Sequence, residues 1–193
     1  MIGELNLCIG PMFAGKTTYL LNKIDELINN NVLKEDIIVI KSSIDNRYSE
    51  EFIISHDNKK YESIQMMYLS GIYDMGVLNM KKKYIFIDEG QFFIDIYDVV
   101  NNLVKDGHNI YISSLNGDSN MELFGDIYKL IPKCDNIYHI KAKCKCGLDA
   151  SFSKKTNNDE NIRKQIIIGG SKLYSSVCRK CYNDENYIIK NDI

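Results

Sequence analysis

Positive charge is not in excess in this chain, and arginine is scarce. Lys and Arg together number 24 against 26 Asp and Glu, which gives a formal net charge of -2. Arginine occurs at positions 47, 163 and 179, and the other basic residues are lysines. This balance argues against a basic face that binds double-stranded nucleic acid. Because arginine is rare, each one is a candidate for a specific contact.

The chain also lacks long hydrophobic segments. No run of 18 apolar residues occurs, so we expect no membrane-spanning helix and no membrane partner. The N-terminus does not show the charged region followed by an apolar region of a signal peptide. We therefore expect a cytoplasmic protein. In a reducing compartment, the six cysteines point to metal ligands or free thiols before disulfides.

The hydrophobic pattern predicts an α/β fold. The 193 residues, 45% of them hydrophobic, suit one domain or one domain with a small appendage. Helix-like patterns over 16–30 and 92–106 lie between apolar runs of strand length, and Gly107 is expected to end the second helix. The runs that we interpret as strands are 5–9, 37–40, 84–87, 109–113 and 137–140. Such alternation predicts a parallel sheet with helices on both faces.

The texture of the sequence changes after about residue 140. Cysteine pairs, Gly169-Gly170 and a polar stretch at 156–161 replace the alternation of strands and helices. We therefore divide the chain into an α/β domain, residues 1–140, and a small second lobe, residues 141–193.

A phosphate-binding loop is predicted where the first strand meets the first helix. Its sequence, GPMFAGKT, fits the pattern G-x-x-x-x-G-K-[ST]. Backbone N–H groups at a helix N-terminus suit phosphate oxygens, a lysine bridges the β and γ phosphates, and a threonine hydroxyl holds Mg²⁺. The predicted phosphate-binding residues are Gly10, Pro11, Met12, Phe13, Ala14, Gly15, Lys16 and Thr17. The alternative, a chance glycine pair opening a structural helix, does not explain the strand before the loop.

An acidic pair follows the strand predicted at 84–87. Asp88 can support Mg²⁺ together with Thr17, and Glu89 can accept a proton from an attacking hydroxyl. Adjacent strand residues point to opposite faces, but the strand ends here, so both carboxylates can reach one site. The alternative is a solvated acidic pair at the end of a strand.

Several motifs together resemble those of type II thymidine kinases, the cellular and poxvirus-type family. The segments GPMFAGKTT, DNRYS, SHD, DEGQFF, IIGG and YSSVCRKCY occur in the family's order and rough spacing, over residues 4–182. The resemblance implies a P-loop NTPase-type domain, a zinc-bound lobe and a lasso-like loop over the nucleoside. It implies phosphorylation of the 5′-hydroxyl of thymidine, and often of deoxyuridine, with ATP and Mg²⁺ in nucleotide salvage. It further implies a homotetramer or dimer, and thymidine triphosphate (dTTP) as a feedback inhibitor.

The resemblance also suggests roles for individual residues. Glu89 corresponds to the base that takes the proton of the 5′-hydroxyl, and Arg47 to an arginine near the phosphates. The residues that correspond to the nucleoside pocket are Met12, Phe92, Leu115, Phe124, Ile167, Gly169 and Tyr174. Without the family, Arg47 would be taken for a surface ion pair and each apolar residue for ordinary core.

The cysteines predict a structural Zn²⁺ site in the second lobe. Cys178 and Cys181 form a C-x-x-C pair, whereas Cys144 and Cys146 form C-x-C, with Lys143 where the first cysteine of the family would align. Zinc needs four ligands in a structural site, and Gly147 gives the backbone freedom after the C-x-C. Other candidates for the fourth ligand are Cys134 and His139, and four free thiols are the alternative to a metal.

Two other functions compete with a nucleoside kinase. DEGQ also resembles the acidic motif of superfamily-1 helicases, which would make the chain a P-loop ATPase that acts on nucleic acid. Such motors need two domains of this kind, and 193 residues suit one. A zinc-ribbon interaction module with an incidental loop would not need Lys16, Thr17 and the acidic strand end. We expect no nucleic-acid partner.

Overall fold

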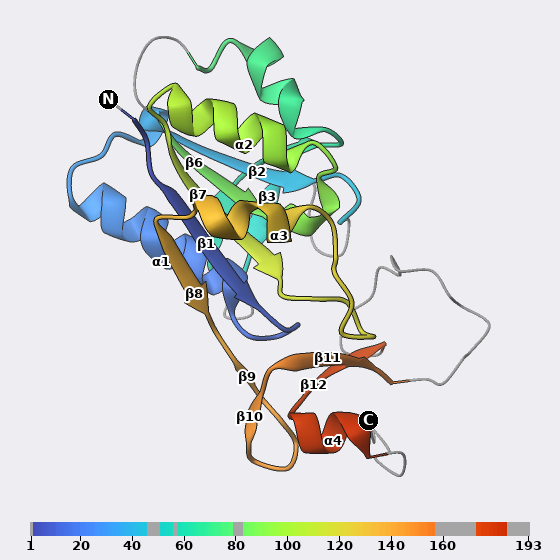
Figure 1. Ribbon diagram of the computed structural model, residues 1–193. Helices are drawn as coiled ribbons and strands as arrows, with labels where there is room; N and C mark the ends of the chain where they lie inside the picture. The colour runs from blue at the N-terminus through green and yellow to red at the C-terminus, as the bar shows by residue number, and fades with distance from the viewer. Residues whose placement is uncertain (1, 46–50, 56–57, 79–82, 157–172, 185–193) are drawn as a thin grey trace.

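Six parallel strands form the central sheet of the computed structural model, which describes residues 2–45, 51–55, 58–78, 83–156 and 173–184 (Figure 1). Every neighbouring pair in the sheet is parallel. In spatial order the strands are β5 (Ile64–Met66), β2 (Ile37–Ser42), β6 (Tyr84–Asp88), β7 (Asn109–Leu115), β1 (Leu5–Gly10) and β8 (Asn136–His139). The sequence predicted five of these strands, and β5 was missed.

Helices cover both faces of the sheet, as predicted (Figure 1). Helix α1 (Lys16–Asn29) buries Leu20 and Ile24 against Val39 and Phe86 on one face. Helices α2 (Ile96–Lys105) and α3 (Ile127–Leu130) pack on the other face. The central strands are therefore apolar on both sides, which explains their unbroken hydrophobic runs.

The prediction of a helix over 92–106 was wrong at its start. Residues Gly90–Phe92 instead form a 3₁₀ turn, η3, and α2 begins at Ile96. The carboxylate of Asp95 accepts the N–H groups of Leu69 and Ser70 at 3.0 and 2.9 Å. The aromatic residues before Ile96 follow a helical spacing, but the backbone there turns at the end of β6. The predicted stop at Gly107 is confirmed, because Gly107 has φ 93°.

Shorter elements connect the main ones. Strands β3 (Phe52–Ile54) and β4 (Lys60–Glu62) form an antiparallel pair. The 3₁₀ helices are η1 (Lys34–Asp36), η2 (Leu69–Met75) and η4 (Ile131–Lys133). Within the described residues, no helix is both long and apolar enough to cross a membrane.

A small lobe follows β8 and has its own core. Strand β9 (Ala142–Lys143) pairs with β10 (Asp149–Ala150), and β11 (Phe152–Lys155) pairs with β12 (Tyr174–Val177). Helix α4 (Arg179–Asn183) completes the lobe, which lies below the sheet in Figure 1. The lasso-like loop expected between β11 and β12 lies outside the described residues.

Candidate active site and metal centre

The phosphate loop connects the end of β1 to the start of α1. A Cβ on Gly10 would lie 2.4 Å from the carbonyl oxygen of Ile140, so the close approach of that segment requires glycine here. The chain then turns through left-handed conformations at Phe13 (φ 59°) and Gly15 (φ 86°). Lys16 is buried, and its Nζ donates to the carbonyl oxygen of Pro11 at 2.8 Å. The side chain of Lys16 is therefore held by a backbone group of the same loop.

Asp88 lies directly beside the start of α1. It is the last residue of β6, and its carboxylate accepts hydrogen bonds from the Thr17 hydroxyl at 3.1 and 3.2 Å and from the Ser113 hydroxyl. Burial raises the pKa of Asp88 to about 6, and the neighbouring Glu89 charge adds to this rise. The hydroxyl groups of Ser113 and Thr17 oppose the rise in pKa because they stabilise the ionised form.

Glu89 and Asp88 line the same cavity. Glu89 has a left-handed backbone conformation, with φ 54° and ψ 47°, which breaks the alternation of a strand. Its N–H group donates to the Ser113 hydroxyl at 3.3 Å. The other residues that line the cavity are Thr17, Lys41, Asp45, Phe52, Ile53 and Ile54. The expectation that both carboxylates reach one site is met by this geometry.

Gln91 fixes the orientation of the Glu89 side chain, and the sequence analysis missed it. Gln91 is 3% exposed, and its Nε2 donates to Oε2 of Glu89. Its Oε1 accepts from the Ser114 hydroxyl at 2.9 Å and from the Leu115 N–H group at 3.1 Å. Two donors on Oε1 leave Nε2 to face Glu89. The available signal in the sequence was an amide inside the DEGQFF motif, two residues after Glu89.

The structure brings together part of the expected nucleoside pocket. The rings of Phe92 and Phe124 meet edge to face, with centroids 5.6 Å apart and an interplanar angle of 88°. Gly125 (φ 61°) follows, and a Cβ there would lie 2.3 Å from the carbonyl oxygen of Gln91. Leu115 is half-buried at the end of β7.

Of the other residues expected at the nucleoside or the phosphates, the structure describes Met12 and Tyr174. Met12 and Tyr174 are each 8% exposed. Arg47, Ile167 and Gly169 lie outside the described residues.

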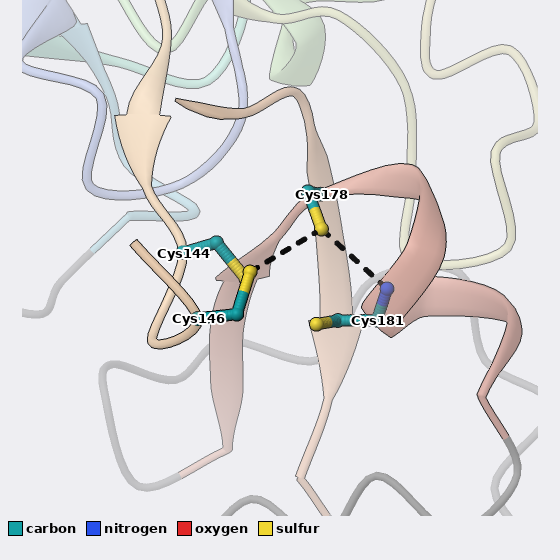
Figure 2. A group of neighbouring side chains, drawn as sticks. All are labelled: Cys144, Cys146, Cys178 and Cys181. Atoms are coloured by element: carbon teal, nitrogen blue, oxygen red, sulfur yellow. Dashed lines mark hydrogen bonds between the residues drawn. The ribbon is translucent and has the colours of Figure 1, made fainter. Parts of the chain in front are cut away.

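The four predicted zinc ligands converge (Figure 2). The sulfur atoms of Cys144, Cys146, Cys178 and Cys181 all lie within 4.8 Å of one another. The sulfurs of Cys146 and Cys178 are 3.6 Å apart. Four tetrahedral Zn–S bonds of about 2.3 Å place the sulfurs about 3.8 Å apart, so the donor set fits zinc. Cys134, another candidate ligand, instead donates its thiol to the carbonyl oxygen of Leu130 at 3.3 Å.

A hairpin turn lets the C-x-C spacing supply two ligands. The N–H group of Gly147 donates to the carbonyl oxygen of Cys144 at 2.8 Å, and the Cys144 N–H donates to Leu148 at 2.9 Å. Gly147 has φ 89°, the conformation for which glycine was expected to be needed.

The thiols of this group differ in acidity. Burial tends to raise the pKa of Cys144, but hydrogen bonds from backbone N–H groups and neighbouring thiols outweigh it. The net effect lowers this pKa to about 6. Burial and the surrounding thiols raise the pKa of Cys181 to about 12.

Comparisons with known proteins show what the chain as a whole is similar to. A family model described as thymidine kinase matches residues 3–182. The thymidine kinase of fowlpox virus (strain NVSL) is 36% identical over 184 residues, which cover 93% of this chain and 97% of the relative. The thymidine kinase of Amsacta moorei entomopoxvirus is 38% identical over 190 residues, which cover 94% of this chain and 98% of the relative. That of vaccinia virus (strain Western Reserve) is 35% identical over 187 residues, with 94% and 98% covered.

Proposed function

This chain belongs to the thymidine kinase family, and we propose that it transfers the γ-phosphoryl group of ATP to the 5′-hydroxyl of thymidine, with deoxyuridine as a further acceptor. One observation carries the proposal: Thr17 of the phosphate loop is hydrogen-bonded to Asp88, and Asp88 and Glu89 line one cavity. Phosphate binding, metal binding and proton transfer need these three groups within reach of one another.

Residues 10–17 bind the phosphates of ATP in this proposal. The Lys16 ammonium exchanges the Pro11 carbonyl oxygen, 2.8 Å away in the structure, for oxygens of the β and γ phosphates. Thr17 and Asp88 are the residues that would hold Mg²⁺, because a hydroxyl beside a carboxylate is a hard oxygen donor set that suits it. The ion, when bound, neutralises charge on the phosphates. Arg47 contacts the phosphates as well.

Glu89 acts as the general base. Its carboxylate accepts the proton of the 5′-hydroxyl while that oxygen bonds to the γ-phosphorus and the bond to the ADP oxygen breaks. Gln91 is a positioning residue, because its side-chain amide donates to Oε2 of Glu89 and so fixes the direction of that carboxylate. The products are thymidine monophosphate and ADP.

The nucleoside lies against an apolar wall in this proposal. Phe92 and Phe124 supply two aromatic faces that are already in contact with each other. Met12, Leu115 and Tyr174 complete the wall, and backbone groups near Ile167 and Gly169 bind the edge of the base.

The four cysteines hold one structural Zn²⁺ in this proposal. Their sulfurs lie within 4.8 Å of one another, which is compatible with tetrahedral zinc, and the ion would join the β9–β10 turn to the start of α4. The separate hydrophobic core around these cysteines supports a division into residues 1–140 and 141–193. Reduced thiols of this kind favour a cytoplasmic location.

We extend the proposal to assembly and regulation. A homotetramer, or a dimer, is the assembly that the family resemblance implies. Strand β8 supports an interface, because Ile137 and Tyr138 are 44% and 37% exposed at the edge of the sheet. Size-exclusion chromatography with light scattering tests the assembly, and dTTP titration of the kinase assay tests feedback inhibition.

One assay tests the proposed activity against a nucleic-acid-dependent ATPase. ATP consumption is measured with thymidine, with single-stranded DNA and with neither, on folded protein whose metal content is known. We expect consumption with thymidine, matched by formation of thymidine monophosphate. Absence of the monophosphate from protein that still binds ATP would refute the kinase assignment, and stimulation by DNA alone would support the motor.

A further inference from the structure

Two serine side chains from the small lobe hold the phosphate loop at one residue, Met12. The Met12 N–H group donates to the hydroxyl of Ser153 at 3.0 Å, and the hydroxyl of Ser176 donates to the Met12 carbonyl oxygen. Ser153 lies on β11 and Ser176 on β12, where they are directly paired across the two strands. They are 4% and 5% exposed. A matched pair of buried hydroxyls thus satisfies both backbone groups of a single loop residue.

These two hydrogen bonds lie next to a strained residue of the phosphate loop. The next residue, Phe13, has φ 59°, a conformation that costs free energy for any residue except glycine. Such a conformation persists when the surrounding structure holds it. The hydrogen bonds at Met12 do this from one side, and Ala14 packs against the core of the lobe on the other side of Phe13.

The hairpin that carries the serines also carries the metal ligands. Cys178 follows Ser176 by two residues, and Val177 between them belongs to the same core as Cys144 and Cys181. The phosphate loop and the cysteine cluster are therefore connected through one short strand, β12.

We propose that Ser153 and Ser176 are positioning residues that keep the phosphate loop in its nucleotide-binding conformation from the cysteine lobe. The proposal rests on the proposed function, in which this loop binds the phosphates of ATP. When a hydroxyl is lost, Met12 keeps a buried polar group without its partner, and the loop spends less time in the binding conformation. The apparent affinity for ATP falls by the same fraction.

The test compares alanine and threonine variants of the two serines. The dissociation constant of MgATP is measured by isothermal titration calorimetry for Ser153→Ala, Ser176→Ala, Ser153→Thr and Ser176→Thr. We expect each alanine variant to raise the constant at least about 5-fold, the lower end of the effect of one unsatisfied buried group. Each threonine variant keeps the hydroxyl and restores most of the affinity.

Ser175→Ala is the matched control. Ser175 lies on the same strand, is half-buried, and points to the opposite face because it neighbours Ser176. We expect its affinity for ATP to stay within about 2-fold of wild type, since a substitution away from such contacts costs little. Metal content and the thermal midpoint are recorded for every variant.

Three results would overturn the proposal. Alanine variants that bind ATP as wild type does would show that the hydroxyls are not needed. Equal losses in the alanine and threonine variants would assign the effect to packing of the hairpin. If the alanine variants do not fold, amide exchange of wild type decides: a Met12 N–H that exchanges as fast as an exposed loop amide contradicts the proposal. Failure of wild type itself to bind ATP would instead refute the proposed function.

Discussion

Replacement of Glu89 by glutamine separates its proposed role as a general base from its role in the structure. In Glu89→Gln, the new amide keeps a carbonyl oxygen that can still accept the hydrogen bond from Nε2 of Gln91. The left-handed backbone at residue 89 is unchanged, because the two side chains have the same shape. The basic lone pairs of the carboxylate are lost. We therefore expect the site to stay assembled while proton transfer loses its acceptor.

The expected loss in kcat is about 10²-fold or more, the lower end of what a general base contributes. A 10²-fold loss corresponds to about 2.7 kcal/mol of activation free energy. The assay is ADP release at saturating thymidine and ATP, and calorimetry measures thymidine binding, which should be unchanged. Glu62→Gln, the same change at an exposed carboxylate on β4, is the control and should leave kcat unaltered.

A kcat of Glu89→Gln within a few-fold of wild type would refute this reasoning. It would show that deprotonation of the 5′-hydroxyl needs no help from Glu89, since loose phosphoryl-transfer transition states ask little of a base. A large loss of thymidine affinity with kcat unchanged would also contradict it. That result would move Glu89 from proton transfer to substrate binding.

Three further predictions concern the candidate active site and the four-cysteine cluster. Gln91→Ala keeps the Glu89 carboxylate but removes the hydrogen bond that orients it. We therefore expect kcat at saturating substrates to fall by about 10-fold, less than for Glu89→Gln. Because the folded state raises the pKa of Asp88 to about 6, it binds the proton more tightly than the unfolded chain does. Urea unfolding of zinc-loaded protein without Mg²⁺ should therefore show wild type losing stability relative to Asp88→Asn as the pH rises from about 4 to about 6, and a constant difference would contradict this. Elemental analysis should find about one zinc per chain, lost in Cys146→Ser together with stability of the lobe, whereas active wild type without metal would refute the site.

The sequence predicted what depends on local patterns. Strands such as β2 and β6 are buried on both faces, so their hydrophobic runs identify them without a partner. The cysteine spacing identified the four residues that converge. By contrast, Phe92 and Phe93 fit a helical spacing, yet the chain forms a 3₁₀ turn over Gly90–Phe92 directly after the left-handed backbone of Glu89.

Contacts between distant residues were not predictable in this way. Ser153 and Ser176 contact Met12 from 141 and 164 residues away, and nothing around either serine in the sequence marks a partner in the first strand–loop–helix unit. Gln91 belongs to the DEGQFF motif, but its orientation depends on Ser114 and Leu115 at the end of β7. The motif indicates that such a residue matters, and the tertiary structure shows through which atom it acts.

The position of β1 in the sheet has a consequence for how the protein is made. Strand β1 carries the phosphate loop, and its neighbours are β7 and β8, so Leu5 pairs with Ile110 and Asn6 with Asn136. During synthesis the first strand therefore leaves the ribosome long before either neighbour exists, and such non-local pairing is slow. The sheet around the nucleotide site is therefore completed only after β8 has emerged. ATP, which binds the finished site, then acts as a late folding ligand that stabilises complete chains over nascent ones.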